Sequence, residues 1–384
     1  MMAYNPYLQF LRYCLGVSSP LPESAKRIDW KKMMTWAESQ AIIGVIYGGI
    51  EKAGTALNIP FDVLMEWIGY AQQIRNQNRL MNDRCVRVVD RFNKDGYLCC
   101  VLKGQGNALM YPNPFLRASG DIDLWIYGSK ESRNREIREV VRYVRKRNPE
   151  GRATYHHIDF GDYEGVGVEV HYRPTYLYNF IINRRLQRWM NQHSLCEMVR
   201  LPDGEGHIPV PTWEFNVVYQ LSHIYRHIMK EGVGMRQIID YYYLLKRATD
   251  FTDYTDEHPM AEKERVLKHL GLMEIAGAVM WVLKEVLGMD ERYLIVPVDE
   301  RRGKFLLEEI MEGGNFGMYV TQKSQKPQKG CFAGAIWLNA DTAIGRNILR
   351  LKRDMRLLRY FPSECLWEPV FRVWHLGWRV AHKF

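Results

Sequence analysis

Two aspartates lie one residue apart inside an apolar run, and this pattern constrains the fold more than any other part of the chain. Asp121 and Asp123 belong to the segment Gly120-Asp-Ile-Asp-Leu-Trp-Ile126. Because side chains alternate between the two faces of a strand, both carboxylates project from one face, and the aliphatic residues fill the other. Two negative charges so close together repel each other unless a cation lies between them. The segment therefore predicts a strand with a divalent metal ion on its polar face.

A turn with two glycines precedes this strand. The turn, Lys103-Gly-Gln-Gly106, follows an apolar segment, Tyr97–Leu102, that predicts another strand. Glycine lets a phosphate approach the backbone closely, and a helix that begins here would direct its free N–H groups at that phosphate. The order of strand, glycine turn, helix and Asp-x-Asp strand predicts a site for a metal-bound nucleoside triphosphate. Lys103 is then a candidate phosphate contact, with simple exposure at a turn as the alternative.

A third carboxylate lies further along the chain in a valine-rich segment, Val166–His171. Its glutamate, Glu169, is costly in the middle of such a strand unless it has a partner. A metal ion shared with Asp121 and Asp123 would be that partner, and three carboxylates are enough to hold one or two Mg²⁺ or Mn²⁺ ions. His171 lies on the same strand face, where it could contact phosphate or orient the acceptor.

Other polar residues have two interpretations each. Arg117 lies four residues before the first aspartate, where it could reach a triphosphate or pair with an acid. His223 and His227 are four apart and share a helix face, which favours packing or lining the acceptor side of a cleft over a metal site, since no third ligand is evident. Arg236 and Asp240 have the same spacing and predict a helix pair, with a role in shaping the pocket as the alternative.

The chain divides by pattern into three regions. Residues 1–95 predict helices, 96–210 predict mixed strands and helices, and 211–384 predict helices with a basic aromatic tail. The expected helices are Trp30–Ile50, Asp62–Phe92, Glu131–Lys146, Thr212–Met229, Gly234–Ala248 and Glu262–Leu287. A hairpin is expected from Tyr155–Phe160 and Val166–His171, a loop over Gly313–Gly330, and a helical tail over Asp341–Phe384.

Composition limits the class of protein without identifying a ligand. The 384 residues carry a net charge of +9, which favours polyanionic partners. The seven cysteines are scattered, so they predict neither a zinc ribbon nor a disulfide framework and fit a reducing compartment. The N-terminus shows no signal-peptide pattern, and no apolar run approaches the roughly 18 residues of a membrane span. We therefore expect a cytoplasmic protein.

Two basic segments could form interaction surfaces. Glu131–Arg147 carries seven arginines and lysines, with acids interspersed. It could bind nucleic acid, but a solvated helix face is favoured. In the tail, aromatic residues alternate with basic ones, which is compatible with peripheral membrane contact. Packing of the aromatic side chains against the body is favoured there; they are Trp367, Phe371, Trp374 and Trp378.

Taken together, these motifs resemble an uncharacterised bacterial nucleotidyltransferase family of the polymerase-beta-type nucleotidyltransferase superfamily. The residues that carry the resemblance are Leu102-Lys-Gly104, Tyr111-Pro112, Arg117, Gly120–Leu124 and Val168–His171. It extends from the N-terminal helices to about Leu245. It implies an α+β fold, with a nucleotidyltransferase core over 96–210 built on a small mixed β-sheet between helical flanking regions.

The resemblance also implies roles for individual residues. Asp121, Asp123 and Glu169 would be the catalytic metal-binding triad, with Glu169 also a candidate base for the incoming hydroxyl. The implied nucleotide-binding residues are Lys103, Gly104, Gln105, Arg117 and His171. The wider superfamily has Gly-Ser after the first strand, with the serine on the triphosphate; this chain has Lys-Gly-Gln-Gly, as its narrower family does.

The resulting functional hypothesis is a metal-dependent nucleotidyltransferase. It would transfer a nucleoside monophosphate from an NTP to a hydroxyl of a small molecule, a protein or an RNA end, and would release pyrophosphate. One rival is a catalytically inactive protein of the same fold that binds a nucleotide or a partner. Another is a nucleic-acid-binding accessory protein. Three acids around one cleft favour the enzyme, because a binding module has no need of them.

Overall fold

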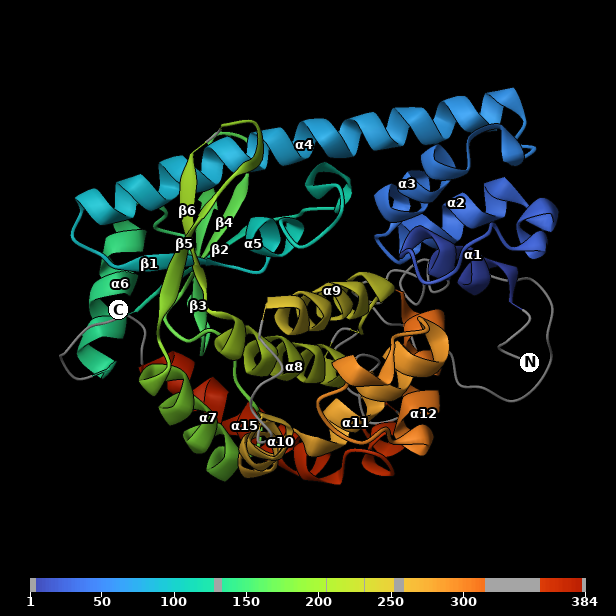
Figure 1. The fold of residues 1–384 in the computed structure, drawn as a ribbon. Coiled ribbons are helices and arrows are strands. Elements are labelled where there is room, and N and C mark those ends of the chain that lie inside the picture. Colours follow the sequence, from blue (N-terminus) through green and yellow to red (C-terminus); the bar gives the residue numbers. More distant parts are fainter. Residues whose placement is uncertain are drawn as a thin grey trace, which may run out of the picture.

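The N-terminal helices lie at one end of the molecule and the main sheet at the other (Figure 1). The structure is a computed structural model that describes residues 5–127, 133–204, 206–230, 232–251, 259–314 and 353–381. Helices α1 (Pro6–Cys14), α2 (Trp30–Ser39) and α3 (Ile43–Ala53) form the N-terminal group. From there, α4 (Phe61–Lys94) runs along to the sheet.

A four-stranded mixed sheet carries the predicted acids. Its strands are ordered β1 (Cys99–Leu102), β2 (Ile122–Ile126), β4 (Gly167–His171) and β3 (His157–Asp162). Strand β2 runs antiparallel to β1 and parallel to β4, whereas β3 and β4 form the predicted antiparallel hairpin. The α+β fold class with a small mixed sheet between helical flanks is thereby confirmed.

The remaining elements are a second pair of strands and a series of helices. A separate hairpin pairs β5 (Cys196–Arg200) with β6 (His207–Pro211). Among the described residues, the α-helices that follow β1 are α5 (Gly104–Ala108), α6 (Arg133–Arg147), α7 (Phe180–Gln192), α8 (Trp213–Lys230), α9 (Met235–Phe251), α10 (Pro259–His269), α11 (Met273–Trp281), α12 (Glu300–Gly313) and α15 (Pro362–Ala381). A π-helical turn, Val282–Val286, continues α11.

The two faces of β2 bury different side chains, as the alternating pattern predicts. Its three aliphatic residues join an apolar cluster with α4 and α6. On the opposite face, Trp125 stacks on Phe215 of α8 with 4.9 Å between ring centroids. Asp123 shares that face with Trp125, so the carboxylate is directed toward the C-terminal helices rather than toward the apolar cluster.

Helix α4 connects the two apolar cores. Its first half, with Trp67 and Ala71, packs in the large helical cluster, and its second half, with Met81 and Phe92, packs under the sheet. At 1.5 Å per residue, its 34 residues span about 50 Å, enough to cross from one core to the other. The two cores therefore meet within α4, and the division of the chain at residues 95 and 210 stays a prediction.

Two of the expected helices are interrupted. The segment expected as one helix from Trp30 to Ile50 forms α2 and α3, separated at Ala41, whose φ is +55°. The one expected from Glu262 to Leu287 breaks at Gly271, where φ is +66°. Helical periodicity continues through both breaks in the sequence, but a left-handed residue ends the hydrogen-bond ladder. The expected loop beyond Gly314 and the first part of the tail, to residue 352, lie outside the described residues.

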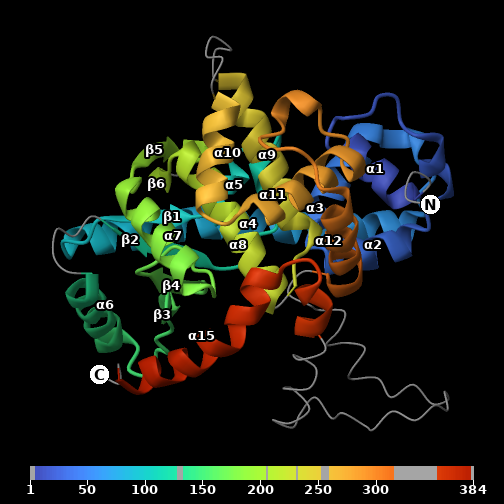
Figure 2. The ribbon, with the colours of Figure 1, turned by 90° about the horizontal axis from the view of Figure 1, so that it is seen from below.

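Helix α15 packs its aromatic residues against the body, as the tail pattern favours. Phe371 is only 2% exposed and stacks on Tyr176 with centroids 5.1 Å apart. Trp367 and Trp374 contact Phe180 edge-on. Seen from below, α15 runs from the side of α12 toward α6 (Figure 2). In the part of the chain that is described, none of the helices has the length and apolar character needed to cross a bilayer.

A buried carboxylate attaches α15 to the start of α7. Glu364 accepts backbone hydrogen bonds from Tyr178 at 2.5 Å and Asn179 at 3.2 Å, and Asn179 is the N-cap of α7. Burial raises the pKa of Glu364 to about 7, although both hydrogen bonds act in the opposite direction. The ordinary pKa is 4.5, so between these two pH values the folded protein holds a proton on Glu364 that the unfolded chain has released.

We predict that Glu364→Gln flattens the pH dependence of stability. The stabilising protonation is fully present below about pH 4.5 and is lost as the pH rises through about 7. A shift of this size corresponds to at most about 3 kcal/mol. Urea denaturation at pH 5 and pH 8 should show wild type losing more stability than the variant. The exposed-site control Glu300→Gln should keep the wild-type difference, and an identical loss in Glu364→Gln would contradict the assignment.

Candidate functional site

The parallel pairing of β2 with β4 brings the three predicted acids to one face of the sheet. In this register Asp123 lies opposite Glu169, and Trp125 opposite His171. Asp121 is the residue immediately before β2. All three carboxylates line a cavity of about 340 Å³. The sheet register thus places side chains 46 residues apart in sequence, those of Asp123 and Glu169, next to each other.

Asp123 is buried between two nitrogen-bearing partners, Lys103 and His171. Its carboxylate is 5% exposed. One oxygen, Oδ2, lies 2.8 Å from Nζ of Lys103, and the other, Oδ1, lies 2.8 Å from Nε2 of His171. Burial alone would raise the pKa of Asp123, but Lys103 and His171 outweigh it and hold that pKa well below its ordinary value. The carboxylate is therefore ionised and compensated.

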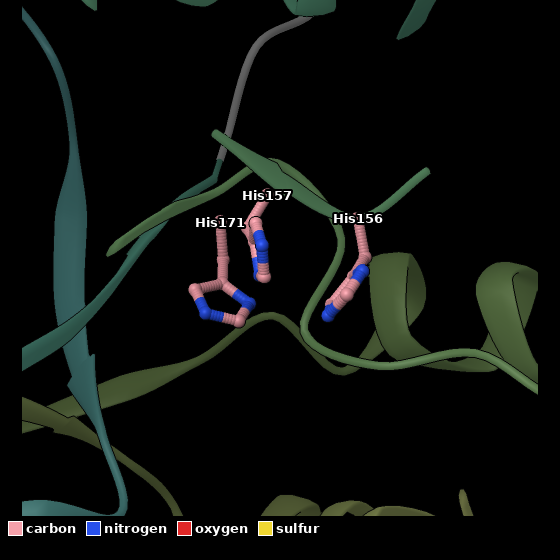
Figure 3. A group of neighbouring side chains, drawn as sticks. All are labelled: His156, His157 and His171. Carbon is pink, nitrogen blue, oxygen red and sulfur yellow. The ribbon is translucent and has the colours of Figure 1, made fainter. Parts of the chain in front are cut away.

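Glu169 lies among histidines. Its Oε2 is 2.9 Å from Nδ1 of His157 and 3.4 Å from Nε2 of His171. Burial would raise the pKa of Glu169, but these contacts hold it well below its ordinary value. Figure 3 shows His157 and His171 side by side, with His156 next to His157. Glu169 is thus kept ionised, which suits a cation ligand better than a proton acceptor.

Donor atoms for a metal ion gather at this point. Asp123, Glu169 and His171 offer ligand atoms within 4.8 Å of one another, as do the three histidines. However, His156 already uses both ring nitrogens, Nε2 with Arg226 at 2.9 Å and Nδ1 with Thr154 at 3.1 Å. The set of Asp123, Glu169 and His171 is therefore a better fit for a hard divalent ion than the three histidines are.

Asp121 supplies the observation that favours a cation here. The negative charge of Asp123, followed by burial, raises the pKa of Asp121, although Lys103 partly offsets them. The raised pKa means that a negative charge on Asp121 is less favourable here than in water, chiefly because Asp123 lies beside it. A divalent ion next to the two aspartates would relieve this repulsion, so the residues present fit the predicted metal.

The wall opposite the acids is basic. It is formed by α8 and α9, whose contributions to the cavity include His223, Arg226, His227, Lys230 and Arg236. Nε2 of His223 lies 3.4 Å from Nζ of Lys103. Burial, followed by the charges of Lys103, His227 and Arg226, holds the pKa of His223 well below its ordinary value, so its imidazole is neutral. His223 and His227 line the cavity, in keeping with the cleft-lining interpretation.

Arg117 forms a buried ion pair. Its Nε and Nη2 each donate to Asp240 at 2.7 Å, and the hydroxyl of Tyr111 donates to the same carboxylate at 2.6 Å. Arg117 is 4% exposed. Of the two roles expected for it, the structure shows the pairing with an acid. Arg117 rather than Arg236 is thus the bidentate partner of Asp240, while Arg236 donates to the carbonyl of Ala118 at 3.0 Å.

The glycine turn has a mixed role. Lys103 adopts φ +52°, and Gly104 follows at φ +42°, where a Cβ would lie 3.9 Å from the carbonyl oxygen of Asp121. Gly106 instead packs on β6, since a Cβ there would lie 2.9 Å from Val210. Gln105 is buried, and its amide donates to Asn78 and Asn82 of α4 rather than lining the cavity. Lys103, Gly104 and Arg117 do line it. The nucleotide-binding roles of all these residues stay predictions.

Sequence reasoning missed several residues of the site. His157 enters because β3 pairs with β4, which sets His157 opposite His171. The expected hairpin contained the signal for this contact. Arg226 and Lys230 continue the helix face of His223 and His227 at spacings of three and seven residues, a pattern that could have found them.

Fold and site together define a class. Neighbouring strands of a small mixed sheet present acids to a cavity with a basic far wall, and this is the architecture expected of nucleotidyltransferases. The chain belongs to the family described as uncharacterised nucleotidyltransferase, whose model matches residues 26–288. The family that the sequence motifs resemble is thus confirmed, and membership supports a general role in nucleotidyl transfer.

Comparison with solved structures gives a similarity to the crystal structure of an antigenic nucleotidyltransferase-like protein from Paracoccidioides brasiliensis. The match covers 49% of this chain and 90% of that chain, with 12% sequence identity and a TM-score of 0.29. No curated protein matches the chain.

We predict that Asp240→Asn strongly destabilises the protein. It leaves the buried guanidinium of Arg117 without its counter-charge, which costs about 3–5 kcal/mol. Urea denaturation should measure this loss, and Arg117→Met/Asp240→Leu should recover much of it, because a buried pair can be replaced by apolar residues at little cost. As a control, Lys304→Gln breaks an exposed pair with Glu300 and should cost less than about 1 kcal/mol. Additive losses in the double variant would contradict the pairing.

Proposed function

We propose that the protein is a metal-dependent nucleotidyltransferase that transfers a nucleoside monophosphate from an NTP to a hydroxyl acceptor and releases pyrophosphate. One observation carries the proposal. The register of β2 on β4 sets Asp123 beside Glu169, with Asp121 at the strand entrance. These acids face a wall of basic side chains across a single cavity.

Asp121, Asp123 and Glu169 are the residues proposed to hold Mg²⁺ or Mn²⁺, with two ions expected. When bound, such ions neutralise charge that develops on the phosphates during an in-line displacement. Buried acids near one another are costly without a cation, and the raised pKa of Asp121 reflects that cost. His171 orients Asp123 through its 2.8 Å hydrogen bond and so acts on the proposed ligand rather than on the substrate.

Lys103 and the basic wall are proposed to bind the triphosphate. Lys103 reaches the cavity from the turn after β1, and its ammonium is held in place by Asp123. Arg226 and Lys230 enter from α8 on the other side. Positive groups on both sides would orient the phosphates and stabilise their charge. Arg117 contributes less to this field because Asp240 already neutralises it.

We predict that the purified protein releases pyrophosphate from at least one NTP in the presence of Mg²⁺ or Mn²⁺. Each of the four NTPs is tested, with cell extract as the source of acceptors. Asp121→Asn should lower the rate at least 100-fold, because it removes a proposed metal ligand without unpairing a buried cation. Asp90→Asn, an exposed carboxylate of α4, provides a control with the same charge change.

Two results would point elsewhere. Equal release by wild type and Asp121→Asn would sink the assignment of the acids. Absence of both release and metal-dependent NTP binding would favour a catalytically inactive protein of this fold.

Metal binding can be measured without turnover. We predict that Mn²⁺ or Mg²⁺ raises the melting temperature of wild type, because an ion that binds only the folded state stabilises it by about 2.7 kcal/mol at 100 times its Kd. The shift should shrink in Asp121→Asn and persist in Asp90→Asn. Removal of the ion with EDTA should return wild type to its starting value. A shift of equal size in all three proteins would show that the ion binds outside the acid cluster.

A further inference from the structure

A second cavity is lined by residues of α7 and α15. These two helices lie next to each other, below the sheet in the view of Figure 1. It has a volume of about 590 Å³, enough for a nucleotide-sized ligand. Three arginines and two tryptophans contribute to its lining, namely Arg173, Arg184, Arg188, Trp374 and Trp378. No acidic side chain is among the described residues that line it. The nucleotidyltransferase site does not account for this cavity.

Its positive charge is concentrated and available. Arg184 and Arg188 are one turn apart on α7 and exposed. Within the described ranges neither has a hydrogen-bond or ion-pair partner, whereas their neighbour Arg185 donates to the carbonyl of His269. Arg173 also lines the cavity, with its guanidinium 4.2 Å from the ring centroid of Tyr155 and its Nη1 donating to the carbonyl of the same residue. Arginines arranged in this way favour a phosphate group, which they can bind through several hydrogen bonds at once.

Its aromatic surface is also accessible. Trp374 is 39% exposed although it packs edge-on against Tyr155 and Phe180, with centroids 5.4 and 5.2 Å apart. Trp378 lies further along α15, 6.2 Å from the ring of Tyr155. Indole rings beside arginines form a platform on which a nucleic-acid base can stack while its phosphate is neutralised.

The cavity adjoins the candidate active site. Tyr155 lines the second cavity and His157 lines the first, and a separation of two residues in the chain places their Cα atoms at most about 7 Å apart. Arg226 of the first cavity also contacts this part of the chain, because its Nη1 lies 2.9 Å from Nε2 of His156 and its guanidinium lies over the ring of Tyr176. A ligand held between α7 and α15 would therefore lie close to the candidate active site.

We propose that this cavity binds a nucleotide unit of the acceptor. The base would stack on Trp374 and Trp378, and the phosphate would bind Arg184 and Arg188. This proposal rests on the proposed function and narrows its acceptor to a nucleotide, either free or at the end of a single strand. The arginines of α6, which the sequence offered as a nucleic-acid surface, have no part in it.

The test is equilibrium binding of a fluorescein-labelled ten-nucleotide single-stranded RNA, measured by anisotropy in EDTA without NTP. Arg184→Ala/Arg188→Ala should weaken binding at least tenfold and lower the slope of log K against log salt by about one to two. Trp374→Ala should weaken it about tenfold or more, and Trp374→Phe should restore most of the affinity because a ring remains.

A matched control removes the same charge from α6. Arg138→Ala/Arg142→Ala deletes two exposed arginines with the same four-residue spacing and should leave binding unchanged. Equal weakening by both pairs would overturn the proposal, since the loss of affinity would then reflect net charge rather than a contact in the second cavity. Wild-type affinity in Arg184→Ala/Arg188→Ala would overturn it as well.

Competitors identify the ligand and its source. Linear polyphosphate, which has charge but no base, should compete poorly; competition equal to that of RNA would overturn the stacking role. Displacement by AMP at concentrations similar to those of unlabelled RNA would support a free nucleotide as the acceptor. Displacement by RNA alone would support a strand end.

Failure of this proposal can be told apart from failure of the proposed function. Asp121→Asn should bind the RNA as wild type does, because it lies in the other cavity. RNA binding without pyrophosphate release under any condition would support the proposal for the second cavity and contradict the proposed transferase activity. Pyrophosphate release that is unaffected in Arg184→Ala/Arg188→Ala, with no RNA binding by wild type, would support the proposed transferase activity and contradict the proposal for the second cavity.

Discussion

The site depends on the burial of one carboxylate, that of Asp123. An unpaired charge at that depth would cost several kcal/mol, so its two partners are structural requirements as much as functional ones. One of them, Lys103, comes from a backbone conformation, φ +52° and ψ −129°, that non-glycine residues rarely adopt. The other, His171, comes from the neighbouring strand. The strained turn at Lys103 and the register of β2 on β4 are thus both needed to compensate the charge of Asp123.

This constraint explains why the core of the site could be predicted from sequence. Alternation in β2 and β4 determines which side chains face away from the apolar cluster, and a one-residue slip would exchange the faces. Acids on the outward faces of two otherwise apolar strands are therefore informative before any pairing is known. Their convergence needs the additional fact that β2 and β4 are parallel neighbours. The family resemblance implied a mixed sheet and the triad, but this pairing is shown by the structure.

The parts that sequence reasoning did not reach are those that depend on distant segments. The short hairpin of β5 and β6, helix α7 and helix α12 were not anticipated. The π-helical end of α11 and the left-handed break at Gly271 interrupt a continuous apolar periodicity. Gln105 was expected at the nucleotide because of its neighbours in the turn, yet its amide bonds to α4. This contact cannot be predicted from the turn alone, because Asn78 and Asn82 precede Gln105 by 27 and 23 residues and their positions depend on how α4 packs in the core.

The distribution of charge in the first cavity favours a particular kind of ligand. Arg117 and Asp240 neutralise each other, which leaves three acids on the sheet and four basic side chains that line the cavity from the turn and from α8 and α9. A binding site for a simple anion would have no use for the acids, and a site for a simple cation would be weakened by the bases. A metal-bound polyphosphate carries both charges, with the cation at one end of the pair and the phosphates at the other. Lys103 lies beside the acids, 2.8 Å from Asp123, and the other three basic side chains come from α8 and α9. The presence of acids and bases around one cavity therefore supports a metal–triphosphate complex over either ion alone.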